Sequence, residues 1–396
     1  MTPPKRILFI MSDTGGGHRA AAEAIRDALI AKHGAEAIDA PFLDGFRVSR
    51  FPMNYMPEFY PWIVNHSKAS WGLGYKLSNS KRRAAFFSAT MYLTNGDRFR
   101  KFFRAQRFDV VVSVHSVLTR PTLRALRSLE QRPPYITVVT DLVSTHHFWY
   151  DRRTERCLVP TQAAYERGLA SGLKPEQLRV TGLPVHPRFT QALRGKAAAR
   201  AELDWTGDAP IVLMVAGGDG MGPLYETAQA IDALGLNCQL AIIAGKNAAL
   251  KARLEAASWQ LPTRIYGFVR NMPTLMEAAD ILVTKAGPAT ITEAAIAGLP
   301  MILFDAIPGQ EEGNVTYVVD NRAGEYAPSP SLVAETVRRW LAEGPQALAE
   351  RAARARAIAN PNAVWDIADE IWAWADHAPI INPRRQRRRS DSVRRR

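Results

Sequence analysis

The feature that most constrains this chain is a pattern that occurs twice along it: an apolar run of strand length, a glycine-rich loop and a helical segment. In the first copy the apolar run covers residues 6–11, the loop covers residues 12–19 and the helical period covers residues 18–32. In the second copy an apolar run at residues 211–215 leads into four glycines within residues 216–223. Strands that alternate with helices in this way are typical of parallel sheets in the α/β class. The chain therefore predicts two doubly wound halves.

Further apolar runs extend each half. They lie at residues 110–114, 136–140 and 156–159 in the first half, and at 240–244, 264–266, 281–283 and 301–304 in the second. We therefore predict two Rossmann-like domains that face a cleft, covering residues 1–186 and 187–361, with linker and lead-in sequence at residues 187–210.

A last helical segment follows at residues 362–376. It places five large apolar side chains where a helix could bury them: Val364, Trp365, Ile367, Ile371 and Trp372. We expect this helix to be able to pack back on the first domain.

Composition and cysteine usage limit the class of protein. With 47% hydrophobic and 22% charged residues the chain is expected to be globular. Its two cysteines, Cys157 and Cys238, are far apart and predict neither a disulfide framework nor a zinc site. The first apolar run is too short for a signal peptide, and no run reaches the roughly 18 residues of a spanning helix. These features predict a cytoplasmic protein, peripheral (monotopic) if it meets the inner face of a membrane.

The positive charge of the chain is concentrated at its end. The net charge is +13, and residues 384–396 hold eight arginines and one aspartate. We predict a basic, disordered tail at residues 377–396. Such a tail is either a solvated extension or a means of attraction to anionic lipid. Nucleic acid would use the same charge, but no motif that reads nucleic acid is present, so no nucleic-acid partner is predicted.

Residues 42–103 are expected to form an insertion that breaks the alternation of strands and helices. The segment is rich in aromatic, Met and basic side chains: Met53, Tyr55, Met56, Phe59, Tyr60, Trp62, Trp71, Tyr75, Lys81, Arg82, Arg83, Phe86 and Phe87. Two interpretations stay open. The aromatic side chains pack on the first domain, or they form a membrane-docking surface in which basic residues meet anionic lipid.

The first glycine loop predicts a catalytic site. Gly16 and Gly17 lack side chains, so a ligand can approach the backbone and the start of the following helix, where free N–H groups favour negative charge. His18 lies in the first turn of that helix, at the carboxyl edge of the predicted sheet. A histidine with a near-neutral pKa can accept the proton of an attacking hydroxyl, so we predict that His18 is a general base.

The second half predicts a site for a nucleotide. Gly217 and Gly218 would hold a diphosphate through backbone N–H groups. Gly287, Pro288, Ala289 and Thr290 begin another helix after a strand, and Glu293 lies one turn further, where it could accept hydrogen bonds from two ribose hydroxyls. Polar groups suited to a sugar follow in the segment that ends at Asn314: Gln310 and Glu311. No Asp-x-Asp sequence is present, so no metal is predicted.

These motifs also resemble a known family. The stretches MSDTGGGHRAAAEAI, VSVH, TDLVSTHHFW, GGDGMGP and TKAGPATITEAAIAGLPMIL, followed by GQEEGN, are similar to those of plastid monogalactosyldiacylglycerol synthases and bacterial diacylglycerol glucosyltransferases. They resemble more distantly the N-acetylglucosaminyltransferase that completes lipid II. The resemblance spans about residues 6–327. It implies the GT-B fold, an inverting mechanism and a UDP-hexose donor.

The resemblance also implies roles for individual residues. It makes His18 the base, Glu293 the ribose ligand, and Gln310 and Glu311 the hexose ligands. Gly267, Phe268 and Val269 correspond to the segment that meets uracil, while Pro57 and Trp149 correspond to positions linked to acceptor or anionic-lipid binding. Ala289 stands where relatives often have glycine, a small change that should leave phosphate binding intact.

The expected function is transfer of galactose or glucose from UDP-galactose or UDP-glucose to the hydroxyl of 1,2-diacylglycerol, without a cofactor, at an anionic phospholipid membrane surface. The sequence leaves the choice of hexose open. Alternatives are another lipid-linked acceptor and a UDP-N-acetylglucosamine 2-epimerase, which shares the fold but needs no acceptor. A catalytically silent binding protein is disfavoured by the presence of both His18 and Glu293.

Overall fold

The computed structural model describes residues 3–14, 16–59, 67–191, 194–205, 207–218, 220 and 222–382. Two compact units divide the chain: Met1–His186 together with Asn362–Arg396, and Pro187–Pro361. The second unit is continuous in sequence, whereas the first unit is built from both ends of the chain.

The first unit contains a parallel sheet in the strand order β2-β1-β4-β6-β7-β8, with β3 also paired to β1. Its strands are β1 (Lys5–Met11), β2 (Ile38–Asp39), β3 (Phe42–Asp44), β4 (Val110–Ser113), β6 (Tyr135–Val138), β7 (Arg156–Val159) and β8 (Leu178–Val180). Because every pair is parallel, the carboxyl ends of all seven strands lie at one edge, and residues that follow a strand are brought together there.

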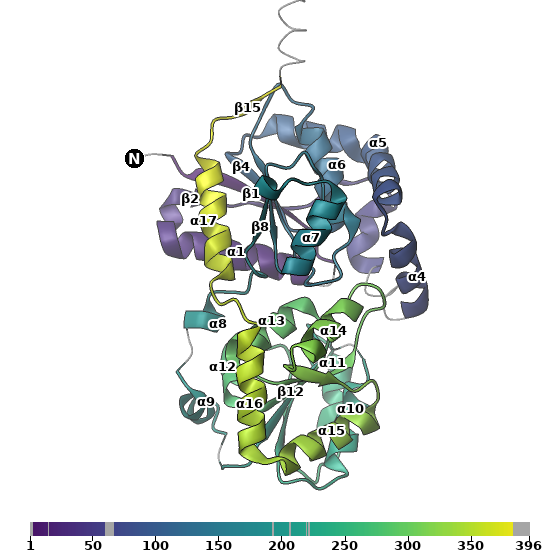
Figure 1. The fold of residues 1–396 in the computed structure, drawn as a ribbon, viewed down its shortest axis with the longest axis vertical. Helices are drawn as coiled ribbons and strands as arrows, with labels where there is room; N and C mark the ends of the chain where they lie inside the picture. Colours follow the sequence, from purple (N-terminus) through teal and green to yellow (C-terminus); the bar gives the residue numbers. More distant parts are fainter. Residues whose placement is uncertain are drawn as a thin grey trace, which may run out of the picture. The chain divides into compact units, whose positions relative to one another are not determined.

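Helices cover both faces of this sheet (Figure 1). Its main helices are α1 (Gly17–His33), α4 (Lys68–Ser78), α5 (Lys81–Ala105), α6 (Ser116–Leu126), α7 (Gln162–Ser171) and α17 (Ala363–Ala375), with the shorter α2 (Gly45–Val48). Successive side chains of a strand point to opposite faces. Accordingly Phe9 packs in a core cluster with α1 and α17, while Leu8 packs in another with α5 and α6.

The second unit contains a parallel sheet in the order β11-β10-β9-β12-β13-β14. Its strands are β9 (Ile211–Val215), β10 (Gln239–Ile243), β11 (Thr263–Tyr266), β12 (Ile281–Lys285), β13 (Met301–Asp305) and β14 (Gly324–Tyr326). Its helices are α8 (Arg188–Gln191), α9 (Lys196–Glu202), α10 (Leu224–Asp232), α11 (Ala248–Glu255), α12 (Met272–Ala278), α13 (Pro288–Ala297), α14 (Glu312–Asp320), α15 (Pro330–Ala342) and α16 (Gly344–Ala357). The predicted fold class, two parallel sheets flanked by helices, is confirmed.

Three sequence-based boundaries were wrong. The predicted insertion 42–103 begins with β3, a strand of the sheet, and ends in α5, whose Phe99 and Phe103 are core residues. The predicted linker 187–210 contains the short helices α8 and α9. Within the predicted disordered tail 377–396, Ile380 and Ile381 form β15, which pairs antiparallel with β5 (Gln131–Arg132). The short elements β3, α8, α9 and β15 have two to seven residues each, which is too few to show a hydrophobic period.

The large apolar side chains of residues 42–103 divide into a group that is at least half-buried and a group that is exposed. Met53 and Met56 pack against the core beneath α5, and Trp71 and Tyr75 are half-buried. Other large apolar side chains of the segment are strongly exposed: Phe51, Tyr55, Phe59, Leu73, Leu77, Phe86, Phe87 and Leu93. Tyr60 and Trp62 lie outside the described residues, as do residues 384–396. In the described part of the chain, no helix is both long enough and apolar enough to cross a bilayer.

Candidate active site

The carboxyl edge of the first sheet holds His18 by two contacts. Its Nδ1 lies 2.8 Å from the carbonyl oxygen of Val114, just after β4, and 3.0 Å from Oγ1 of Thr140, just after β6. A carbonyl oxygen only accepts hydrogen bonds, so Nδ1 must carry the proton. The Nε2 lone pair of His18 is therefore the free basic position, and Nε2 has no partner among the described residues.

Burial lowers the pKa of His18 from its ordinary value of 6.5 to about 4, although the hydrogen bond with Val114 acts in the opposite direction. The imidazole is therefore neutral near pH 7, the state in which it can accept a proton. A nearby diphosphate would favour the imidazolium and raise this pKa, because opposite charges stabilise each other. An anionic ligand beside His18 would therefore make its imidazole a stronger base.

Two further rings pack around His18. His115 lies 4.3 Å away between ring centroids, and its Nε2 is 3.2 Å from Oγ1 of Thr14. Trp149 lies 6.2 Å away, is fully buried, and donates from Nε1 to the buried carboxylate of Asp141 at 2.6 Å. His115 and Asp141 were not predicted as site residues. Both directly follow the sequence of a predicted strand, which is the signal that could have identified them.

The start of α1 is open above the loop. Gly16 takes the left-handed conformation with φ of 73°, and Cβ atoms built on Gly16 and Gly17 would meet nothing within 4 Å. The backbone at the start of α1 is therefore accessible beside Gly16 and Gly17, and a helix start favours an anion.

Pro57 stands apart from this group. The structure buries it in the segment after β3, and it forms no hydrogen bond with His18 or Trp149, because proline has no N–H and its carbonyl oxygen has no such partner among the described residues. Neither Pro57 nor the fully buried Trp149 presents a surface to a lipid.

The second sheet gathers the predicted nucleotide residues at its own carboxyl edge. The loop after β9 turns through Gly217, Gly220 and Gly222, all with positive φ. A Cβ on Gly220 would lie 2.4 Å from the carbonyl oxygen of Ala244, so this loop packs too closely on the loop after β10 for any larger residue. Gly218 has open space around it. Asp219 and Met221 lie outside the described residues.

The start of α13 is the clearest anion-binding element of this edge. Gly287 occupies the N-cap and Pro288 the first helical position, where its missing N–H costs nothing. Ala289 and Thr290 are half-buried in the first turn. Ala289 adds only a methyl group at this helix start, where free N–H groups favour an anion.

Glu293 lies one turn into α13, half-buried and without a hydrogen-bond partner among the described residues. Burial raises its pKa from 4.5 to about 8, against the opposing charge of Arg188. Hydrogen bonds donated by two hydroxyls would favour the ionised form and lower this pKa. Glu293 is thus a carboxylate whose surroundings lack the donors that would stabilise its charge.

Glu311 was predicted to contact a sugar, but its side chain is not exposed. It is almost fully buried, with Oε1 2.8 Å from Nζ of Lys285 and Oε2 accepting from the N–H of Ile307. Asn314 is also buried and donates to the carbonyl oxygen of Ala286. Both side chains hold the loop after β12 in place. Gln310, one residue earlier, is only half-buried and is the more accessible polar group.

Lys285 was missed by the sequence analysis. A Cβ on Gly287 would lie 3.3 Å from its Nζ, and a Cβ on Gly217 would lie 3.3 Å from its Cε. The amine therefore lies between the two glycine-containing loops. Its position two residues after a predicted strand, within the motif TKAG, was the available signal.

Phe268 and Val269 follow β11 at the same edge. The Phe268 ring is 61% exposed, with Nζ of Lys246 5.7 Å from its centroid. An exposed ring beside a cation is suited to stacking against a flat base. No group of His, Cys, Asp and Glu that could hold a metal ion occurs in the part of the chain that the structure describes.

Family models match both halves of the chain. Residues 18–185 match the model described as monogalactosyldiacylglycerol (MGDG) synthase, and residues 212–371 match the glycosyltransferase family 28 C-terminal domain. The probable monogalactosyldiacylglycerol synthase 2, chloroplastic, of Oryza sativa subsp. japonica is 37% identical over 93% of this chain and 80% of its own length. The monogalactosyldiacylglycerol synthase 2, chloroplastic, of Arabidopsis thaliana is 36% identical over the same shares.

Solved structures share the fold. MurG of Acinetobacter baumannii superposes with a TM-score of 0.61 at 17% identity, over 93% of this chain and all of its own. A UDP-GlcNAc 2-epimerase of Neisseria meningitidis superposes with a TM-score of 0.59 at 12% identity, over 93% of this chain and 99% of the epimerase chain. These identities establish the GT-B fold alone. The sequence relationship goes further: with more than a third of its residues shared across nearly its whole length, this chain belongs to the monogalactosyldiacylglycerol synthase family of glycosyltransferases.

Proposed function

We propose that this protein transfers galactose from UDP-galactose to the hydroxyl of 1,2-diacylglycerol, with inversion at the anomeric carbon, and so forms a β-galactolipid. Membership of a family whose relatives are named for that product supports the choice of galactose over glucose. The single observation that carries the chemistry is His18, a neutral histidine with a fixed tautomer whose Nε2 has no hydrogen-bond partner among the described residues.

In this proposal the donor binds at the carboxyl edge of the second sheet. The N–H groups at the start of α13 and the loop at Gly217 and Gly218 would take the diphosphate, with Lys285 supplying a positive charge between them. Glu293 would accept hydrogen bonds from the ribose hydroxyls. Its raised pKa supports this role, because no described residue donates to the carboxylate and the ribose would supply these donors. Phe268 and Val269 would meet the uracil, and Gln310 the hexose, while Glu311 and Asn314 would act by holding the loops.

The proposed reaction is a single displacement. The acceptor oxygen attacks the anomeric carbon from the face opposite UDP while its proton passes to Nε2 of His18. The bond from the anomeric carbon to the UDP oxygen breaks, and its electrons leave with the diphosphate. The product is the β-glycoside, UDP and an imidazolium, which then returns the proton to solvent. Helix starts and loop amides would stabilise the charge on UDP, so the residues present can carry out the reaction without a metal.

The acceptor is a lipid, and the first unit carries a surface suited to reaching it. Phe51, Phe86 and Leu93 are each at least 76% exposed, a costly arrangement unless another apolar phase covers them. Lys81, Arg82 and Arg83 stand at the start of the same helix as Phe86 and would meet anionic head groups. We propose peripheral attachment of this surface to an anionic membrane. Trp149, which is buried beside His18, would shape the acceptor site, whereas Pro57 would act only through the packing of its own segment.

The rival function is epimerisation of a UDP-sugar, which shares the fold at 12% identity. An epimerase needs no lipid acceptor, so the exposed apolar side chains of residues 51–93 would have no purpose in it. The family relationship also favours transfer.

The test is incubation of the protein with either UDP-galactose or UDP-glucose and diacylglycerol in vesicles that contain phosphatidylglycerol. Mass spectrometry would identify the lipid product, and proton NMR would give its anomeric configuration. A β-galactosyl lipid is expected. A glucosyl product would correct the donor, an α-linkage would exclude the displacement at His18, and a new UDP-sugar without lipid product would favour the epimerase.

A further inference from the structure

His115 has no part in the reaction as proposed, yet its imidazole packs against the base. The residue follows β4, forms the N-cap of α6 and is 5% exposed. Its ring centroid lies 4.3 Å from that of His18, with the two ring planes tilted by 44°. Its ring also meets the ring of Phe46 at 5.2 Å. The side chain forms no capping hydrogen bond with α6, so it has no structural role in starting that helix.

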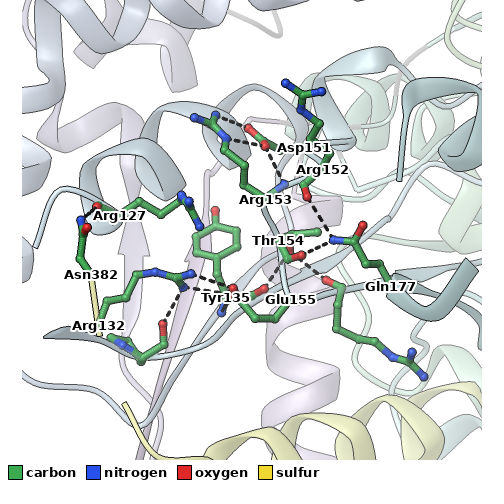
Figure 2. A network of polar contacts seen from close by, with 12 residues as sticks. Arg127, Arg132, Tyr135, Asp151, Arg152, Arg153, Thr154, Glu155, Gln177 and Asn382 are labelled. Carbon is green, nitrogen blue, oxygen red and sulfur yellow. Dashed lines mark hydrogen bonds and ion pairs between the residues drawn. The ribbon is translucent and has the colours of Figure 1, made fainter. Parts of the chain in front are cut away.

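The backbone of His115 is fixed by a polar network within the first unit. Its carbonyl oxygen accepts from Oγ1 of Thr119 at 3.0 Å, and the carbonyl oxygen of Thr119 accepts from the hydroxyl of Tyr135 at 3.1 Å. Figure 2 shows the next contacts of this network, where the N–H of Tyr135 and the guanidinium of Arg132 donate to the carboxylate of Glu155. The imidazole of His115 therefore extends from a backbone that is held in place.

The same imidazole connects the first glycine loop to the base. Its Nε2 lies 3.2 Å from Oγ1 of Thr14, a buried residue of that loop. Thr14 stands two residues before Gly16, whose left-handed backbone precedes the first turn of α1. Because one imidazole contacts both Thr14 and the ring of His18, a displacement of His115 would disturb the loop and the base together.

The second nitrogen of His115 shows that packing alone does not account for an imidazole here. Nδ1 is buried and has no hydrogen-bond partner among the described residues. Most buried polar atoms are paired, and an unpaired one costs stability. A phenylalanine ring could fill the same space without this cost, but it could not bond to Thr14. Local features that cost stability in this way are typical of functional sites.

His115 is also a neutral neighbour for the base. Burial lowers the pKa of His115 well below 6.5, and the charge of His18 lowers it further. In the proposed reaction His18 becomes an imidazolium, and a second positive charge in contact with it would oppose that step. A neutral His115 leaves His18 able to accept the proton.

We propose that His115 is a positioning residue for the transfer reaction: its imidazole fixes the orientation of His18 and holds the glycine loop beside the base through Thr14. This inference rests on the proposed role of His18. Orientation matters because a reacting group displaced by about 1 Å can lose about 10²-fold in rate. His115 acts through its two neighbours and takes no part in bond formation.

The experiment removes the bond between His115 and Thr14 from either side in the whole protein. His115→Phe keeps a ring, Thr14→Val keeps the branched shape, and a double variant combines them. The matched control is His33→Phe, because His33 stacks on Trp372 at 3.6 Å and also has a buried, unpaired nitrogen. His33 lies near the other end of α1, about 22 Å from His18 at about 1.5 Å per residue.

We expect kcat for transfer from UDP-galactose to diacylglycerol to fall about 10- to 100-fold in each single variant. The double variant should lose at most about twofold more, because all three variants remove the same hydrogen bond. The melting temperature of His115→Phe should not fall, since the unpaired nitrogen is removed with the imidazole. The control His33→Phe should keep kcat within about twofold of wild type.

The pKa of His18 separates a positioning role from a structural one. NMR titration of isotope-labelled histidine measures this pKa without any substrate. His115→Phe keeps His18 buried and should leave its pKa near 4, whereas His115→Ala admits water and should raise it toward 6.5. The activity of His115→Ala relative to wild type should therefore decrease from about pH 7 to about pH 5, while that of His115→Phe stays constant.

Three results would overturn the proposal. They are a kcat within about twofold of wild type in both His115→Phe and Thr14→Val, additive losses in the double variant, and an unchanged pKa of His18 in His115→Ala. A wild-type protein that transfers no sugar to lipid would instead reject the proposed function. The NMR titration needs no reaction, so in that case it still decides whether His115 controls the environment of His18.

Discussion

His18 is held by two strand ends of the first sheet, so removing its imidazole should affect the chemical step with little effect on structure. His18→Ala is expected to lower turnover by about 10²–10⁴-fold, the usual range for loss of a general base. UDP affinity should stay unchanged, because the proposed donor residues belong to the second unit. Steady-state kinetics and calorimetry measure the two quantities, with the exposed His377→Ala as control. Turnover close to wild type in His18→Ala would remove this residue from the mechanism.

Glu293 should make nucleotide binding depend on pH. Its pKa of about 8 in the free protein means that the carboxyl is largely protonated at pH 7, whereas ribose hydroxyls bind the ionised form. UDP affinity should therefore increase by up to about tenfold per pH unit as the pH rises from about 6.5. The increase should level off above pH 8. Calorimetry with UDP across this range measures the effect.

Glu293→Gln is the matched control for that dependence. It should bind UDP more weakly at pH 8 and lose the rise with pH. The same raised pKa acts on folding: the folded chain holds a proton that the unfolded chain releases near pH 4.5, so ionisation of Glu293 costs stability between about pH 4.5 and 8. The Gln variant should therefore melt at a higher temperature than wild type at pH 8.5. A flat affinity profile in the wild type would place the ribose elsewhere.

At the scale of elements, α17 is joined to the first sheet by a charged contact that can be separated from its apolar packing. Glu370 accepts from Arg156 of β7 and Arg179 of β8, each within 3.0 Å. Burial alone would raise the pKa of Glu370, but these hydrogen bonds more than offset it, so the pKa lies below 4.5. The contribution of Glu370 to the free energy of unfolding is thus complete above about pH 4.5. It is lost as the pH falls through the lower pKa that Glu370 has in the folded protein.

Glu370→Gln should therefore destabilise the protein by about 2 kcal/mol at pH 7, with a smaller difference at pH 3. Asp366 provides the matched control on the same helix, since its contact with Arg179 is exposed and 3.8 Å long. Asp366→Asn should cost less than about 0.5 kcal/mol. Urea unfolding at both pH values measures the difference. Equal effects of the two variants would mean that apolar packing alone attaches α17.

Helix α5 carries the apolar side chains proposed to enter a membrane. Replacing Phe86 and Leu93 with Ser should lower binding to phosphatidylglycerol vesicles several-fold at every ionic strength, because apolar transfer is not screened by salt. Both side chains are 76% exposed, so the melting temperature should not fall. Leu234→Ser with Leu332→Ser, exposed leucines of the second unit, is the control. Equal sedimentation of the two double variants would assign the docking surface elsewhere.

The elements show how far the sequence could be read. Long apolar runs such as β1 and β9 were predicted within one residue, because strands buried on both faces have a continuous apolar sequence. β8 and β14 were missed, since each has three residues and an exposed side chain at Val180 or Tyr326. Candidate site residues could be predicted where a glycine loop or the start of a helix follows a predicted strand. Whether Glu311 faces a ligand or pairs with Lys285 depends on contacts between loops far apart in sequence.

For the whole molecule, the arginines at residues 384–396 add charge without apolar surface. Deleting them should reduce sedimentation with anionic vesicles at low salt and have little effect at high salt, since the Debye length falls from about 30 Å at 0.01 M to about 3 Å at 1 M. This salt dependence contrasts with that of the Phe86 and Leu93 variant. Sedimentation across a salt series distinguishes them, and an equal loss at high salt would show that the tail binds by more than charge.

The placement of α17 has a consequence for the order in which the molecule is made. This helix packs on α1 and completes a core cluster with Phe9 and Val112, yet the ribosome synthesises it only after the entire second unit. At about 5–20 residues per second, the second unit takes roughly 10–30 s to emerge. Throughout that interval the face of the sheet that α1 and α17 share is covered by α1 alone and exposes the apolar side chains that α17 later buries. The first half of the chain is therefore the last to reach its native state, and a nascent chain stalled near residue 360 should be a substrate for chaperones that bind exposed apolar surface.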